Sequence, residues 1–146
     1  MAIPQLNQNG ELPPGEHLAT LEEVDSTFGQ STERRKHLMT GLKAGALNLQ
    51  AAGVCRIWIN GSFITAKADP DDIDGCWEYT SSVALEKVDS VFLSESRAPM
   101  KIKYGLEFFP ASLIEADSGL PFPKFFQVNR ENEIKGIVVV NLGGLP

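Results

Sequence analysis

Two carboxylates that flank one apolar residue are the groups of this chain best placed to do chemistry. Asp72 and Asp74 lie on either side of Ile73, at the start of a strand that we expect to run from about residue 72 towards residue 79. Because strand side chains alternate in direction, both aspartates point to one face while Ile73 points into the core. Carboxylate oxygens in this arrangement form a clamp for a hard cation such as Mg²⁺.

A glycine and a serine close the preceding predicted strand, residues 54–59, at the same edge. Gly61 allows a phosphate to approach the backbone, and the hydroxyl of Ser62 can hold phosphate oxygens together with nearby amides. Lys67, in the following polar turn, is positioned to meet a phosphate, although contact with solvent alone explains it equally well. The acidic residues of that turn, Asp69 and Asp71, fit ordinary turn chemistry.

A third carboxylate, Glu107, extends this arrangement. Alternation predicts a strand over residues 101–109 in which four apolar residues share one face: Ile102, Tyr104, Leu106 and Phe108. Glu107 then faces the same way as Asp72 and Asp74, on the side of the sheet without helices. Two like charges about 5 Å apart cost roughly 3 kcal/mol at an effective dielectric constant near 20. Such a cluster therefore implies a bound cation, a protonated carboxylate, or a functional reason to tolerate the repulsion.

Length and composition limit the class of protein. The chain has 146 residues, with 13 Lys and Arg against 19 Asp and Glu, a net charge of −6 and an apolar fraction of 42%. This is the size of one domain with an ordinary core. The negative charge argues against nucleic acid as a general partner, and no apolar run approaches the ~20 residues of a membrane span. Two cysteines and the absence of a signal-peptide pattern lead us to expect a cytoplasmic protein with no membrane partner.

Proline and glycine punctuate the first thirty residues. We expect residues 1–30 to pack as an N-terminal arm on a single domain that spans residues 31–146. Within the arm, Thr20-Leu21-Glu22-Glu23 has the spacing of a capping box and predicts a short helix.

The domain alternates helices with strands. Apolar residues at helical spacing predict a helix over residues 31–52. The run Arg34-Arg35-Lys36 in its first turns is interpreted as a solvated helix face or, alternatively, an anion or partner site. A β-branched run predicts a last strand over residues 136–141. This order of elements indicates an α/β or α+β protein.

The segment from Gly61 to Asp74 resembles the motif of a known superfamily. A Gly-Ser at a strand end, a spacer of nine residues and then Asp-Ile-Asp are similar to the pattern of the polymerase β-type nucleotidyltransferases, in which a third carboxylate lies on a later strand. The resemblance implies a mixed β-sheet with helices packed mainly on one face. It also implies transfer of a nucleoside monophosphate from a nucleoside triphosphate, with two Mg²⁺ ions as cofactors.

The same resemblance implies roles for individual residues. Gly61 and Ser62 would contact the triphosphate, and Asp72 and Asp74 would hold the metals. Glu107 would be the third ligand and a possible base, although the superfamily more usually has Asp there. More closely, the chain resembles a group of short nucleotidyltransferase-like proteins of bacteria and phages, for which the likeness implies no established activity. The shared segments are residues 4–15, 61–74 and 135–137.

The resulting hypothesis is a Mg²⁺-dependent nucleotidyltransferase whose acceptor is a hydroxyl of a macromolecule, most simply a protein. A chain of 146 residues has no room for the usual second domain that carries the acceptor contacts. The rival hypothesis is a catalytically inactive module with the same fold, such as an antitoxin or a phage-encoded interaction protein. Other cations are weaker candidates for triphosphate contacts: Arg97, Lys101, Lys103, Arg130 and Lys135. An aromatic group is interpreted as core closure or as a protein interface: Phe122, Phe125 and Phe126.

Overall fold

One mixed sheet organises the chain. The computed structural model describes residues 3–129 and 131–144, and within them five strands form a sheet in the order β1-β5-β2-β3-β4. Their bounds are Gly15–Ala19 (β1), Arg56–Asn60 (β2), Ile73–Trp77 (β3), Leu106–Pro110 (β4) and Gly136–Asn141 (β5). The pairs β1–β5 and β3–β4 are parallel, and β2 is antiparallel to both of its neighbours.

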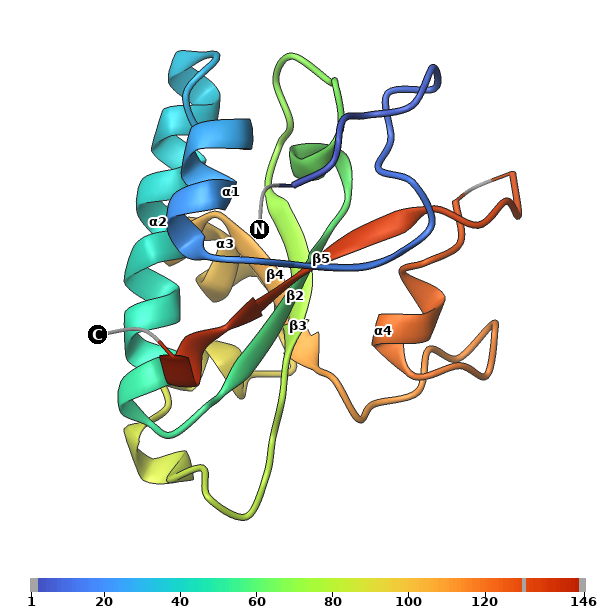
Figure 1. Ribbon diagram of the computed structural model, residues 1–146. Coiled ribbons are helices and arrows are strands. Elements are labelled where there is room, and N and C mark those ends of the chain that lie inside the picture. The colour runs from blue at the N-terminus through green and yellow to red at the C-terminus, as the bar shows by residue number, and fades with distance from the viewer. Residues whose placement is uncertain (1–2, 130, 145–146) are drawn as a thin grey trace.

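Four α-helices complete the described part of the fold: α1 (Leu21–Phe28), α2 (Glu33–Ala51), α3 (Ala98–Tyr104) and α4 (Phe122–Phe125). Figure 1 shows α1, α2 and α3 on one side of the sheet and the short α4 on the other. The first side is called the helix face here, and the second the site face. The expected α/β class, with a mixed sheet and most helices on one face, is confirmed.

The core lies between α2 and the helix face of the sheet. Helix α2 begins after Thr32, whose side chain accepts a hydrogen bond from the backbone amide of Arg35. Its buried stripe includes Leu38, Leu42 and Leu49, which recur at helical spacing. This helix confirms the one predicted over residues 31–52. No helix in the described ranges is both long enough and apolar enough to cross a membrane.

The strand predicted over residues 101–109 is wrong in its first half. Residues 98–104 form α3, and Gly105, with φ 69°, ends the helix before β4 begins. Tyr104 is buried and stacks on Phe92, whereas Ile102 is 86% exposed. The alternating polarity of residues 101–104 is compatible with a short helix as well as with a strand. Gly105, in the left-handed conformation, ends a helix here, so the helix forms.

The N-terminal segment supplies a strand that the sequence pattern did not predict. Residues 15–19 form β1, which runs parallel to β5 at one edge of the sheet. Gly15-Glu16-His17-Leu18-Ala19 has little β-branched character, so the pairing depends on β5 rather than on local preference. The capping box that starts α1 is present as predicted, with hydrogen bonds in both directions between Thr20 and Glu23.

A buried arginine of α2 holds the loop that follows β2. Arg35 is 3% exposed, so the interpretation of this position as a solvated face is wrong. Its guanidinium donates to backbone carbonyl oxygens at distances of 2.6 to 3.3 Å, in Phe28, Ser62, Phe63, Thr65 and Lys67. A planar group with five donors suits this cluster of acceptors. Arg35 therefore fixes the loop that starts at Gly61.

Replacing Arg35 by methionine should destabilise the protein by about 3 kcal/mol or more, because the loop carbonyls lose a charged donor and stay buried. The matched control is Lys36→Met. Lys36 is an exposed neighbour whose ion pair with Glu33 spans 3.5 Å, and the loss of this pair should cost less than about 0.5 kcal/mol. Urea unfolding of both variants measures the difference. Equal midpoints would contradict this role of Arg35.

Candidate metal centre

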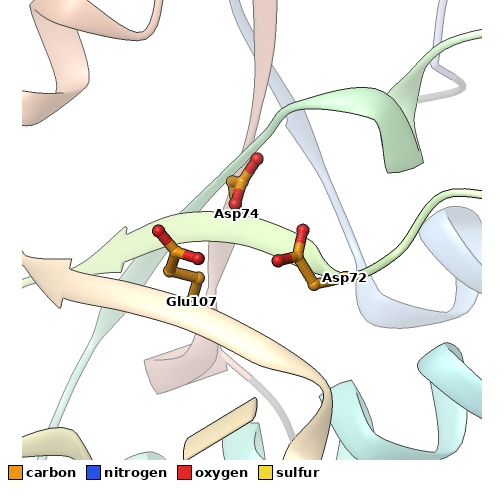
Figure 2. A group of neighbouring side chains, drawn as sticks. All are labelled: Asp72, Asp74 and Glu107. Carbon is orange, nitrogen blue, oxygen red and sulfur yellow. The ribbon is translucent and has the colours of Figure 1, made fainter. Parts of the chain in front are cut away.

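Three carboxylates meet on the site face. Asp74 of β3 and Glu107 of β4 are directly paired in the parallel ladder, and Asp72 immediately precedes β3. Each of the three offers an oxygen that lies within 4.8 Å of the others. Figure 2 shows the three carboxylates pointing towards one another on the same side of the two strands. The grouping of Asp72, Asp74 and Glu107 follows from strand alternation, as predicted.

Gly61 makes room for this group. It follows β2, whose last residue, Asn60, is paired with Asp74, and it has φ 80°. A Cβ atom at Gly61 would lie 2.3 Å from Oδ2 of Asp74. Ser62 then begins a 3-10 turn, Ser62–Ile64, beside the carboxylates. A residue without a side chain is therefore required here both by the backbone angle and by the approach of Asp74.

Crowding and burial change the acidity of the central carboxylate. Burial raises the pKa of Asp74 to about 7, and the negative charges of Asp72 and Glu107 add to the effect. A hydrogen bond to Asp72 also favours the protonated form, whereas Lys101 opposes it. Near neutral pH, Asp74 can therefore hold a proton that a cation would displace.

Two cations of the α3 segment face the other carboxylates. The Nζ atom of Lys101 lies 3.0 Å from Oδ2 of Asp72, and a guanidinium nitrogen of Arg97 lies 2.8 Å from Oε1 of Glu107. Both cations are about half exposed and can move into solvent. Without a metal, Lys101 and Arg97 offset the negative charges of Asp72 and Glu107.

Of the other basic residues predicted to contact phosphate, some line the cleft over the carboxylates and others do not. Lys67 lines the same cleft as the carboxylates, in keeping with its predicted place beside the site. Lys135 lines it too and donates a hydrogen bond to Oδ1 of Asn60. Lys103 instead pairs with Asp89, at 2.5 Å, and is not part of the lining. Arg130 lies outside the described residues.

A cleft of about 1140 Å³ lies over the carboxylates. Aromatic residues from β4, from α4 and from the position just after α4 form part of its wall: Phe109, Phe122, Phe125 and Phe126. Phe122 stacks on Phe109 with ring centroids 4.6 Å apart. Residues of the N-terminal segment, Asn9 and Glu11, form another part. Neither wall was predicted for the site, because both are brought to it by contacts between distant segments.

The chemistry of the donor set suits a hard divalent cation. Oxygens bound to one Mg²⁺ ion are at most about 4.2 Å apart, since each bond is about 2.1 Å long. The observed spread of 4.8 Å is close to this limit and is also compatible with two adjacent ions. Asp72, Asp74 and Glu107 are therefore the residues that could hold a metal.

One known protein family matches nearly the whole chain. Residues 4–141 match DUF6932, which is described as a family of unknown function. The chain belongs to this family. No curated protein and no solved structure matches it. The mixed sheet and the three clustered carboxylates of this DUF6932 member are compatible with a nucleotidyltransferase fold.

Gly61→Ala should destabilise the protein by at least about 2 kcal/mol more than Gly119→Ala. Both glycines have positive φ, so both substitutions cost about 1 kcal/mol in backbone strain. A Cβ at Gly119 meets nothing within 4 Å, whereas one at Gly61 collides with Asp74. Chemical denaturation measures the difference. Two variants of equal stability would mean that Asp74 moves away without penalty.

The stability of the metal-free protein should depend on Asp74 in a pH-dependent way. Because its pKa is raised from 3.8 to about 7, the folded state binds more protons than the unfolded chain within that window. The contribution of Asp74 to the stability therefore falls as the pH rises from about 4 to about 7, and the Asp74→Asn variant lacks this loss. Relative to the native protein, this variant should gain on the order of 4 kcal/mol between pH 4 and pH 8, since one pKa unit corresponds to about 1.4 kcal/mol.

Thermal or urea unfolding in the presence of a chelator provides the measurement. Asp71→Asn is the matched control, since Asp71 lines the same cleft but is exposed. A pH-independent difference between the Asp74→Asn variant and the native protein would show that the carboxyl group is not under electrostatic strain.

Proposed function

We propose that this DUF6932 member is a metal-dependent nucleotidyltransferase, which transfers a nucleoside monophosphate from a nucleoside triphosphate to a hydroxyl of a protein acceptor. The observation that carries the proposal is the group of three carboxylates within 4.8 Å, next to the Gly61-Ser62 turn in a large cleft. The resemblance of this turn and of Asp72-Ile73-Asp74 to nucleotidyltransferases supports the same reading.

The carboxylates have distinct tasks in this proposal. Two Mg²⁺ ions, held by Asp72, Asp74 and Glu107, would neutralise the developing charge on the attacking and leaving oxygens. Asp74 would release its proton to solvent when a cation binds, because the cation would then supply the positive charge that stabilises the carboxylate. Asp72 and Glu107 exchange their ion pairs with Lys101 and Arg97 for the cation. Glu107, whose side chain is 20% exposed in the cleft, is the group placed to accept the proton of the acceptor hydroxyl.

The backbone and the cleft position the nucleotide and the acceptor. The turn at Gly61 and the hydroxyl of Ser62 bind phosphate oxygens, and Lys67 lies at the same wall. The described lining has eight acidic residues against four basic ones, which disfavours a nucleic-acid acceptor. A protein acceptor brings its own surface to a domain of this size. Nucleoside triphosphates and Mg²⁺ are abundant in the cytoplasm, which is where the proposal places the protein.

One observation favours a second candidate, a non-catalytic binding module. Arg97 and Lys101 form ion pairs with two of the three carboxylates, so the charges are largely compensated without a metal. A module of this kind would keep the cleft for a protein partner and would not respond to Mg²⁺ or nucleotides.

Millimolar Mg²⁺ together with a non-hydrolysable nucleoside triphosphate should raise the melting temperature of the native protein. A ligand at 100 times its dissociation constant stabilises by about 2.7 kcal/mol, which corresponds to several degrees for a domain of this size. The Asp72→Asn, Glu107→Gln double variant should show no such shift. The control Glu115→Gln, which removes a cleft carboxylate outside the group of three, should respond like the native protein.

Catalysis is measured as release of pyrophosphate and as transfer of label from α-labelled ATP, GTP, CTP and UTP to protein. Label transfer that requires Mg²⁺ and disappears in the double variant supports the enzyme. A melting temperature indifferent to Mg²⁺ and to all four triphosphates rejects the enzyme and leaves the binding module.

A further inference from the structure

Lys135 carries a buried ammonium group that has no carboxylate partner among the residues that the structure describes. The residue is 9% exposed and precedes β5. Among residues 3–129 and 131–144, its Nζ atom has one hydrogen-bond acceptor, Oδ1 of Asn60, and no carboxylate oxygen within 4.0 Å. An ammonium group has three donors, so its hydrogen-bonding capacity is mostly unused.

A buried charge of this kind is expensive to maintain. Removing an ammonium group from water costs several kcal/mol unless a partner compensates it. Burial lowers the pKa of Lys135, whereas the negative charges of Glu11 and Asp74 raise it. These two carboxylates act from a distance and form no ion pair with it. A purely structural lysine would more simply be paired or replaced by an apolar residue.

The place of Lys135 indicates the kind of ligand that would satisfy it. It lines the same cleft as Asp72, Asp74 and Glu107, and its hydrogen-bond acceptor, Asn60, immediately precedes Gly61. An anion in the cleft would therefore meet the phosphate-binding turn and Lys135 together. Asn60 is itself 8% exposed and keeps the ammonium group in place before a ligand arrives.

We propose that Lys135 binds the phosphate chain of the nucleotide and is the main fixed cation for it in this cleft. This inference rests on the proposed function and adds the residue that selects a polyphosphate. The other lining cations differ from it. Lys67 is exposed, and Arg97 and Lys101 are occupied by carboxylates. Lys135 alone among these four is both buried and free of a carboxylate.

The test compares Lys135→Met with Lys103→Met in the full chain. Both variants lose one positive charge, but Lys103 lies outside the cleft lining and pairs with Asp89. Binding of inorganic triphosphate in the presence of Mg²⁺, measured by calorimetry, should weaken at least tenfold in Lys135→Met and less than twofold in Lys103→Met. Binding of Mn²⁺ alone should be unchanged in Lys135→Met. Its melting temperature should be equal to or higher than that of the native protein.

A second variant tests the same inference while the lysine is retained. Asn60→Asp gives Lys135 a carboxylate partner, which should occupy the ammonium group and weaken triphosphate binding at least tenfold. Asn9→Asp adds the same charge elsewhere in the lining and serves as its control, with a smaller effect expected. If Lys135→Met does not fold, the comparison of Asn60→Asp with Asn9→Asp still tests whether Lys135 binds triphosphate. Equal affinities of the Asn60→Asp and Asn9→Asp variants for triphosphate would overturn the inference.

The outcomes separate this inference from the proposed function. Triphosphate binding that depends on Lys135, without any label transfer, supports the phosphate site and rejects the transferase. Label transfer with the same KM for the nucleotide in Lys135→Met and native protein supports the transferase and overturns the role of Lys135. Failure of the native protein to bind triphosphate also overturns it.

Discussion

The repulsion among the three carboxylates is the interaction that the neighbouring cations and the protonation of Asp74 have to offset. The parallel ladder between β3 and β4 places Asp74 beside Glu107, and Asp72 precedes the same strand, so the strand register alone brings the charges together. Each close pair costs roughly 3 kcal/mol at an effective dielectric constant near 20. Lys101 and Arg97 offset part of this energy, and protonation of Asp74 removes another part. Without a metal, protonation of Asp74 and the two ion pairs therefore lower the repulsion within the site.

The position of the site depends on a residue of the helix layer. Arg35 of α2 reaches the carbonyl oxygens of the loop after β2 and fixes the turn at Gly61, which in turn lies against Asp74. A lysine could not replace it, because a single ammonium group has three donors and no planar fork to satisfy several carbonyls. The core and the site are in this way coupled through one guanidinium, and changes in the packing of α2 reach the carboxylates.

The parts of the site that follow from local periodicity could be predicted from the sequence, and those that depend on distant contacts could not. Alternation was enough to place Asp72, Asp74 and Glu107 on one face, and β5 begins and ends at the predicted residues 136–141. The same alternation led to a wrong strand over residues 101–104, where Gly105 ends a helix. This error concealed the fact that α3 carries the counter-cation Lys101. The buried state of Arg35 has no local signal, since its acceptors lie 27 to 32 residues away for four of the five carbonyls.

Two titratable groups of the cleft, Asp74 and Lys135, have charged forms that burial disfavours. Their presence together bears on the choice between an enzyme and a binding module. A carboxyl group with a pKa of about 7 and a buried ammonium group with one hydrogen bond both raise the free energy of the folded protein. A protein-binding module needs neither, because complementary charges on an exposed rim are sufficient for docking. A divalent cation with a polyphosphate satisfies both at once, since the metal binds the carboxylates and the phosphate binds the ammonium group. A ligand that combines the two charges, as a metal-bound nucleotide does, would then recover the free energy stored in both groups, whereas a cation or an anion alone would recover it from one.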